Sequence, residues 1–314
     1  MLSVEQMDRI TASLSKYQSG SGGFAGGPQQ ISHLAATYAV VNALFTVSSE
    51  AADRVIDKVS LYKYLSSMKQ ADGSYTMHVD GETDVRGIYC ALSVAYLTGI
   101  LDEKLIEGCA QWITSCQTYE GGFGGFPGAE AHGGYTFCAV AALAILKSLD
   151  QCDVKSLLRF ITNRQQSFEG GFAGRTNKLV DGCYSFWVGG IFPILHTYLS
   201  SKGMTLMHLI SFQSSPLLGL HLPADKWLFN EEALQDYLLC CCQDTAGGLL
   251  DKPDKRRDYY HTCYALSGLS VTQNKFSAPG TRTSTGREEN KVTPIHPFFN
   301  VHLQAIEAIK EQTF

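Results

Sequence analysis

The sequence predicts an all-α fold, an α/α barrel (toroid) in which helix pairs stack side by side and close on themselves. Two observations lead to this prediction: a repeated turn and a two-helix pattern around it. The turns are Gly22-Gly23-Phe24, Asp72-Gly73-Ser74-Tyr75, Glu120-Gly121-Gly122-Phe123, Glu169-Gly170-Gly171-Phe172 and Ala246-Gly247-Gly248-Leu249, preceded by Gln18, Gln70, Gln117, Gln166 and Gln243. The unit is about fifty residues long, with an insertion near Ser201 to Lys226 before the last turn, and such self-similarity marks a repeat architecture.

Each unit contains two helical patterns. The segment before a turn is amphipathic, as in Leu105 to Cys116, and predicts an outer helix. The segment after a turn is apolar nearly all round, as in Tyr135 to Leu146, which is typical of a buried inner helix. An open solenoid is the alternative, but such apolar inner helices favour closure. About eleven helices can be counted where six pairs need twelve, so we expect the barrel to lack one N-terminal helix.

At 314 residues the chain is long enough for one large domain or two ordinary ones, and we expect a single domain over residues 1–314. Apolar residues make up 45%, and the net charge of −5 argues against nucleic-acid binding. The longest apolar run, Phe137 to Leu146, is too short to be a transmembrane segment, and the N-terminus lacks a signal peptide pattern. The ten irregularly spaced cysteines indicate reduced thiols and a cytoplasmic protein.

In the C-terminal part of the chain we expect a mobile surface loop at 274–290, an extended segment at 294–300 and a last helix from Val301 to about Glu311.

The starts of the inner helices carry the polar chemistry. Aligning these helices on their first aromatic residue places Tyr38, Tyr89, Phe137, Phe186 and Tyr264 in register. Five residues earlier stand His33, Asp84, His132, Asp181 and Tyr259, and three earlier stand Ala35, Arg86, Gly134, Cys183 and His261. In a barrel these N-termini gather at one end, where free N–H groups favour anions, so we expect the active site there.

Asp181, Cys183 and His261 are the candidate metal ligands. In this register His261 occupies the position that Cys183 holds one repeat earlier, so neighbouring inner helices would present all three side chains to one point. Three protein ligands with one open position are typical of catalytic zinc. The alternative is structural: a capping aspartate, a buried thiol and a hydrogen-bonded histidine.

Two further groups of residues accompany the metal candidates. Cations and hydrogen-bond donors at the same end would suit a diphosphate; these are Arg86, His132, Arg175, Lys178 and Tyr184. Aromatic residues would line the cavity together with a thiol; these are Tyr89, Tyr135, Trp187, Tyr264 and Cys138. Isolated surface charges and ordinary core packing are the alternatives for the two groups. Together they suit a long apolar ligand with a diphosphate head.

Several long motifs in this order resemble the β subunits of protein farnesyltransferases, in the protein prenyltransferase β-subunit family. The motifs are Asp181-Gly-Cys-Tyr-Ser-Phe-Trp187, Glu130-Ala-His-Gly-Gly-Tyr-Thr-Phe137, Gly247-Gly-Leu-Leu-Asp-Lys-Pro253, Asp258-Tyr-Tyr-His-Thr-Cys-Tyr264 and Thr293-Pro-Ile-His-Pro297. The resemblance runs from about Gly22 to Gly268. The acid motif of terpene cyclases and the thioester motif of complement proteins, which share this fold, are both absent from the sequence.

The resemblance implies roles for individual residues. It implies zinc ligands at Asp181, Cys183 and His261, with Tyr184 and Asp251 also in the catalytic set; diphosphate binding by His132, Arg175, Lys178 and Tyr184; isoprenoid contacts at Arg86, Tyr89, Gly134, Tyr135, Cys138 and Trp187; and peptide contacts at Trp187 and Tyr260. Asp251 matches a position linked to Mg²⁺ in farnesyltransferases, where geranylgeranyl relatives carry lysine. Tyr264 matches an aromatic position that limits pocket depth.

The function implied is that of a transferase active as a heterodimer with an α subunit. It would move farnesyl from farnesyl diphosphate to the cysteine thiol of proteins ending in a Cys-a-a-X motif. Two alternatives stay open: a geranylgeranyltransferase β subunit, and a truncated, non-catalytic form that binds the α subunit or lipid without turnover.

Overall fold

The computed structural model describes residues 2–203, 228–274 and 284–306. The α-helices are α1 (Val4–Leu14), α2 (Leu34–Val47), α3 (Ser49–Val55), α4 (Lys58–Met68), α5 (Val85–Leu97), α6 (Glu103–Ile106), α7 (Cys109–Ser115), α8 (Gly133–Ile145), α9 (Val154–Thr162), α10 (Tyr184–Trp187), α11 (Ile191–Ser201), α13 (Glu231–Asp236) and α14 (Tyr259–Gln273). Short helical turns are η1 (Ser15–Tyr17), η2 (Leu149–Gln151), η3 (Tyr237–Cys241) and η4 (Glu288–Asn290), and the strands are β1 (Ile295–His296) and β2 (Val301–His302).

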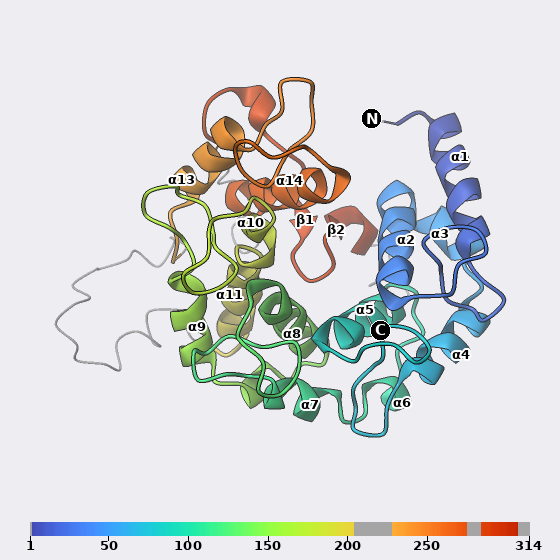
Figure 1. Ribbon diagram of the computed structural model, residues 1–314. Coiled ribbons are helices and arrows are strands. Elements are labelled where there is room, and N and C mark those ends of the chain that lie inside the picture. The colour runs from blue at the N-terminus through green and yellow to red at the C-terminus, as the bar shows by residue number, and fades with distance from the viewer. Residues whose placement is uncertain (1, 204–227, 275–283, 307–314) are drawn as a thin grey trace.

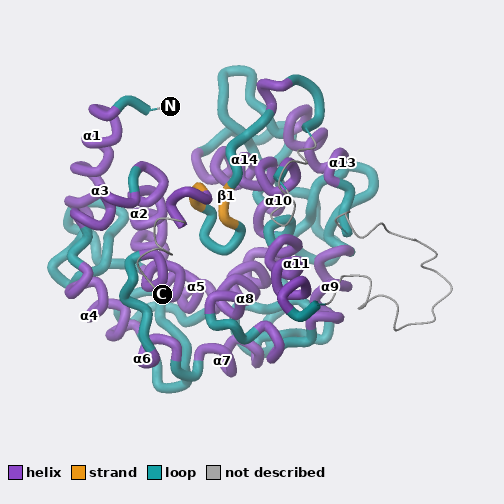
Figure 2. Tube along the Cα trace, turned by 180° about the vertical axis from the view of Figure 1, so that it is seen from behind, coloured by secondary structure: helices purple, strands orange, loops and turns teal. Residues whose placement is uncertain are grey.

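The helices form two concentric layers. The inner helices α2, α5, α8, α10–α11 and α14 pack against one another in chain order, and both views show them around a common centre (Figures 1 and 2). The helices α1, α4, α6–α7, α9 and α13 precede them in the chain and lie towards the outside (Figure 1). The predicted α/α barrel is therefore confirmed, with five outer–inner pairs in the described residues.

A repeated side-chain bond joins three of the turns to the outer helix that follows. The Gln117 amide donates to the carbonyl of Asp153 at 3.0 Å and accepts from its N–H at 2.9 Å. Gln18 makes the same two bonds with Asp57, and Gln165 makes them with Asn230. All three partners are N-cap residues of the following outer helices. The fourth repeat glutamine is thus Gln165, and the prediction of Gln166 was one residue out.

The turn glycines allow the backbone of one repeat to touch the next. Gly121 has a φ of +99°, and a Cβ built there would lie 1.9 Å from the carbonyl oxygen of Ser156. Gly22 repeats this geometry against Ser60. Only glycine combines the left-handed backbone with so close an approach, so Gly22 and Gly121 are required by the packing of one repeat on the next.

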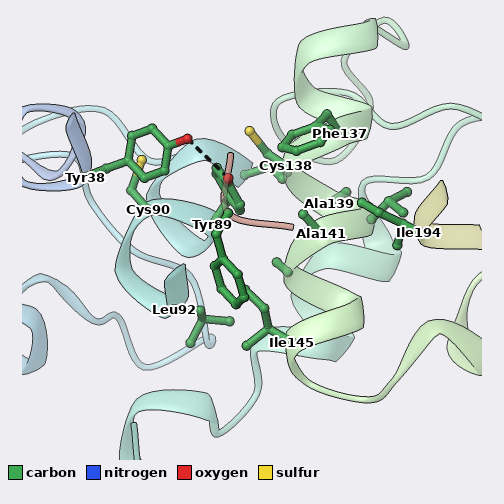
Figure 3. Close-up of a cluster of buried hydrophobic side chains, with 14 of the residues drawn as sticks. Tyr38, Tyr89, Cys90, Leu92, Phe137, Cys138, Ala139, Ala141, Ile145 and Ile194 are labelled. Carbon is green, nitrogen blue, oxygen red and sulfur yellow. Dashed lines mark hydrogen bonds between the residues drawn. The ribbon is translucent and has the colours of Figure 1, made fainter. Parts of the chain in front are cut away.

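The inner helices α5 and α8 bury most of their side chains. In α8, Phe137, Ala139 and Ala141 are wholly buried, and Figure 3 shows them facing Tyr89 and Ile194 from neighbouring helices.

Two predicted helices are interrupted. The outer segment Leu105–Cys116 divides into α6 and α7 at Gly108, whose φ is +72°. The inner helix after Asp181 divides into α10 and α11.

A β-hairpin closes the ring between α14 and α2. Strand β1 pairs antiparallel with β2, β1 contacts α14 and β2 contacts α2. Both views place this hairpin inside the ring of inner helices (Figures 1 and 2). The last helix predicted from Val301 begins instead with β2, and helix follows at 303–306. Residues 275–283 of the predicted loop and 307–311 of the predicted helix lie outside the described residues, as does most of the insertion, 204–226.

Among the described helices, none combines the length and apolar character needed to cross a membrane.

Candidate active site

Asp181, Cys183 and His261 meet at one end of the barrel, as the sequence predicts. One ligand atom from each lies within 4.8 Å of the others. Asp181 and Cys183 precede α10, whereas His261 lies in the first turn of α14. Because α10 and α14 pack side by side, residues about eighty positions apart in the chain reach the same point.

The register that suggested this convergence is one residue out in the last repeat. Helix α14 begins after Asp258, which caps it through the N–H of His261. Thr262 then bonds Leu249 across the turn, as Thr136 bonds Phe123 two repeats earlier. By this measure His261 stands one position beyond the equivalent of Cys183. The three side chains still converge, since one ligand atom from each lies within 4.8 Å of the others.

The hydrogen bonds of His261 leave one ring nitrogen facing the other ligands. Nδ1 lies 2.7 Å from Oδ2 of Asp258, and Nε2 lies 3.3 Å from Oδ1 of Asp181. A carboxylate on Nδ1 holds the proton there and directs the Nε2 lone pair at a metal, a pairing that is common around metal-binding histidines. Asp258 was assigned no role from the sequence, although its position three residues before His261 on a helix start could have indicated one.

The donor set fits a zinc ion. Cys183 is only 4% exposed, and burial together with the Asp181 carboxylate raises the pKa of its thiol. Without a cation, a thiolate and a carboxylate this close repel each other, and the thiol keeps its proton. A divalent ion removes that conflict, and one sulfur, one nitrogen and one oxygen ligand are all found around zinc.

His132 and Tyr184 form a neutral donor pair beside this cluster. His132 caps α8 by accepting the N–H of Gly134 on Nδ1, and its Nε2 lies 3.0 Å from the Tyr184 hydroxyl. Burial and then Arg175 lower the pKa of His132, so the ring is neutral at pH 7 and carries its proton on Nε2. The His132 Nε2–H therefore donates a hydrogen bond to the Tyr184 oxygen. The Tyr184 hydroxyl hydrogen is not used in that bond and can bond an anion.

The loop between Ala173 and Val180 carries the two predicted cations. Arg175 pairs with Glu130 at 2.9 Å, and Lys178 is exposed. The loop rests on Arg164, a buried arginine whose guanidinium donates to the Thr176 hydroxyl at 3.1 Å. Sequence reasoning missed Glu130 and Arg164, because neither stands in a repeat position that marks it.

Aromatic rings continue from the metal ligands into the barrel. The Trp187 and Tyr264 rings lie 4.2 Å apart between centroids, and the Trp187 indole donates to the Tyr260 hydroxyl at 2.7 Å. Tyr260 also contacts the His261 ring edge-on at 5.1 Å. The residues predicted to meet a peptide and a lipid thus form one wall next to the metal ligands.

Arg86 and Tyr135 make a further contact between a cation and an aromatic ring. Arg86 makes a two-pronged ion pair with Asp84, which raises the pKa of the guanidinium, and lies 5.8 Å from the centre of the Tyr135 ring. Its charge is already matched by Asp84. Arg86 is therefore not a free cation.

Asp251 lies directly behind the metal cluster. Its carbonyl accepts the N–H of Gly182, between Asp181 and Cys183, at 2.7 Å. Both carboxylate oxygens of Asp251 lie 2.5 Å from the Lys252 ammonium.

The two predicted lipid contacts Tyr89 and Cys138 lie deeper in the barrel and are almost fully buried.

Comparisons with known proteins agree with this architecture. The prenyltransferase alpha-alpha toroid domain matches residues 1–301. The chain is 41% identical to the protein farnesyltransferase subunit beta of Pisum sativum, over 94% of this chain and 81% of that protein. It is 45% identical to the same subunit of Schizosaccharomyces pombe, over 84% of this chain and 65% of that protein.

More distant relatives share the fold. The geranylgeranyl transferase type-1 subunit beta of Arabidopsis thaliana is 32% identical over 79% of this chain and 61% of that protein. The solved structure of Candida albicans protein geranylgeranyltransferase-I complexed with GGPP matches with a TM-score of 0.72 and 20% identity, over 100% of this chain and 87% of that one. The chain therefore belongs to the protein prenyltransferase β-subunit family, a family of transferases.

Proposed function

We propose that the chain is the catalytic β subunit of a zinc-dependent protein farnesyltransferase. It would transfer farnesyl from farnesyl diphosphate to the cysteine thiol of proteins ending in a Cys-a-a-X motif. The convergence of Asp181, Cys183 and His261 next to the aromatic wall carries this proposal. This arrangement places a site for a metal that binds thiolates beside an apolar surface. A reaction between a thiol and an isoprenoid requires both.

Asp181, Cys183 and His261 would hold the zinc, and Asp258 would fix the orientation of His261. Zinc bound there would lower the pKa of an incoming cysteine thiol, so that a thiolate exists near neutral pH. Cys183 is a ligand in this scheme and does not attack the lipid. The Trp187–Tyr260 pair would position the peptide beside the metal ligands.

The neighbouring donors would bind the diphosphate and stabilise its charge as it leaves. Arg175 and Lys178 supply cations, and the Tyr184 hydroxyl hydrogen is left free by the His132 tautomer. Donors fixed before the reaction stabilise developing charge at little reorganisation cost. Asp251 would supply the carboxylate for Mg²⁺, which proteins bind through one or two carboxylates plus substrate phosphates.

An α subunit is the proposed partner, because the similar plant and yeast proteins are named as β subunits. The preference for farnesyl rests on Asp251 and Tyr264 and on the higher identity to farnesyltransferase subunits than to the type-1 geranylgeranyl subunit. All ten cysteines are free thiols, which suits a cytoplasmic location.

The test is co-expression with an α subunit, followed by metal analysis and a transfer assay. We expect one zinc per heterodimer and faster transfer from farnesyl than from geranylgeranyl diphosphate to a Cys-a-a-X peptide. A geranylgeranyl preference would overturn the farnesyl assignment. Zinc and lipid binding without thioether formation in a single turnover would show the non-catalytic alternative instead.

A further inference from the structure

The Asp251 carboxylate, which is proposed to bind Mg²⁺, already has a cation beside it. A single ammonium group, that of Lys252, lies 2.5 Å from both carboxylate oxygens. The side chains of Lys252 and Asp251 are 25% and 18% exposed, against 38% and 52% for Arg175 and Glu130. Because water and salt screen a sheltered pair less than an exposed one, the Lys252 charge neutralises Asp251 effectively.

Hydrogen bonds fix the backbone of Asp251 next to the metal ligands. Its carbonyl accepts the N–H of Gly182 at 2.7 Å and the hydroxyl of Tyr237 at 3.1 Å. Gly182 stands between the candidate ligands Asp181 and Cys183. The carboxylate of Asp251 therefore starts from a held position and cannot move away with its backbone when its side-chain partner changes.

A tight turn fixes the backbone of Lys252 as well. The N–H of Lys255 donates to the carbonyl of Lys252 at 3.2 Å. Pro253 and Asp254 lie between them, and Asp254 has a φ of +67°. Proline followed by a residue with positive φ is typical of a type II turn. Only the flexible side chain of Lys252 is thus free to leave the carboxylate.

The contact with Lys252 competes with a divalent ion. Proteins bind Mg²⁺ through one or two carboxylates together with substrate phosphates, so the ion would depend on the oxygens of Asp251. Both oxygens contact the Lys252 ammonium. An ammonium and a divalent cation repel each other strongly at so short a distance, so the two cannot share this carboxylate.

We propose that Lys252 is the internal cation of Asp251 and sets how much Mg²⁺ the enzyme needs. Lys252 holds the carboxylate when no divalent ion is bound, and it has to release both oxygens before such an ion can bind there. This inference rests on the proposed function and adds the residue that controls its metal dependence. Lys252 is a positioning residue in this role, because it acts through Asp251.

The test measures metal binding directly, with Mn²⁺ as the probe in place of Mg²⁺. The zinc-loaded heterodimer is saturated with a non-transferable analogue of farnesyl diphosphate, and free Mn²⁺ is measured by electron paramagnetic resonance. Lys252→Met keeps the length of the side chain and removes its charge, and it should tighten Mn²⁺ binding by about fivefold, the upper end of what such an ion pair contributes. Lys252→Arg, which keeps the charge, should bind Mn²⁺ as the unaltered protein does.

Two further variants distinguish competition from simple repulsion by a nearby charge. Lys255→Met removes an exposed ammonium from the same turn and should leave Mn²⁺ binding nearly unchanged. With Asp251→Asn as the background, Lys252→Met should no longer tighten Mn²⁺ binding, because there is no carboxylate to release. Equal tightening in both backgrounds would overturn the inference.

A transfer assay on the same samples separates this inference from the proposed function. If the unaltered heterodimer joins no farnesyl to a Cys-a-a-X peptide at saturating Mg²⁺, the proposed function fails and the role of Lys252 fails with it. If farnesyl is transferred but Lys252→Met binds Mn²⁺ no more tightly than Lys255→Met, the function stands and the role of Lys252 is wrong. A lower Mg²⁺ concentration for half-maximal transfer in Lys252→Met would support it.

Discussion

At the scale of single residues, the site depends on partners that hold the ligands in place. His261 is pinned through Nδ1 by Asp258, and Arg175 is balanced by Glu130. Neither carboxylate is itself a proposed ligand. Their removal therefore tests the geometry of the site without removing the groups that bind metal or diphosphate.

Asp258→Asn should weaken zinc binding by about 10- to 100-fold, the usual cost of losing the hydrogen-bond partner of a metal ligand. Asparagine still caps a helix, so α14 should keep its start. The measurement is competition for zinc with a chelator of known affinity. Asp254→Asn, the same change at a nearby exposed residue, is the control; equal affinities in the two variants would remove Asp258 from the site.

Glu130→Gln should tighten the binding of a lipid diphosphate by about two- to fivefold. The Glu130 carboxylate occupies the Arg175 guanidinium at 2.9 Å, and an exposed ion pair of this kind is worth up to about 1 kcal/mol. The measurement is a fluorescence titration with a non-transferable analogue of farnesyl diphosphate. Glu169→Gln, at an exposed residue one repeat further on, should have no effect; weaker binding in the Glu130 variant would mean that the pair orients Arg175.

At the scale of elements, the turns join the repeats. The Gln117 amide satisfies two backbone groups of Asp153 and also donates to the carbonyl of Gly121 at 3.0 Å. It does so at the point where α9 begins. The same device at Gln18 and Gln165 means that α4, α9 and α13 are each positioned by the turn of the repeat before them.

Gln117→Ala should destabilise the fold by about 1 kcal/mol, because the two bonds to Asp153 are exposed and only the bond to Gly121 is partly buried. The heterodimer should then melt several degrees lower, at about 2–4 °C for each kcal/mol. Gln111→Ala, at an exposed position of α7, supplies a matched control that should not lower the melting temperature. A Gln117 variant as stable as that control would show that water replaces the amide.

The elements also show what sequence could predict and why. Helix pairs and turns repeat, so their pattern was visible, and it brought His261 near Cys183 although the register was one residue out. The hairpin β1–β2 occurs once and is held by contacts with α2, α5 and α14. No local sequence pattern predicts hydrogen bonds between segments so far apart in the chain. The burial of Tyr89 and Cys138 agrees instead with the core-packing alternative, which the apolar pattern of the inner helices already indicated.

At the scale of the whole molecule, the proposed zinc would join two parts of the ring. Its ligands come from the starts of α10 and α14, and the segment that separates them in the chain includes α11 and α13. A ligand that binds only the folded state stabilises that state in proportion to the logarithm of its concentration over its Kd. The metal would then be a structural tie as well as part of the chemistry.

Removing zinc should therefore lower the melting temperature of the heterodimer. A chelator excess that strips a metal present at about 100 times its Kd would cost about 2.7 kcal/mol. Differential scanning calorimetry before and after chelation, with metal analysis of both samples, measures the shift. Asp181→Asn removes one ligand charge, and its melting temperature should respond far less to the chelator. If the unaltered protein loses its zinc without any change in melting temperature, the cluster does not tie α10 to α14, and the stability of the ring must come from packing and the turn glutamines alone.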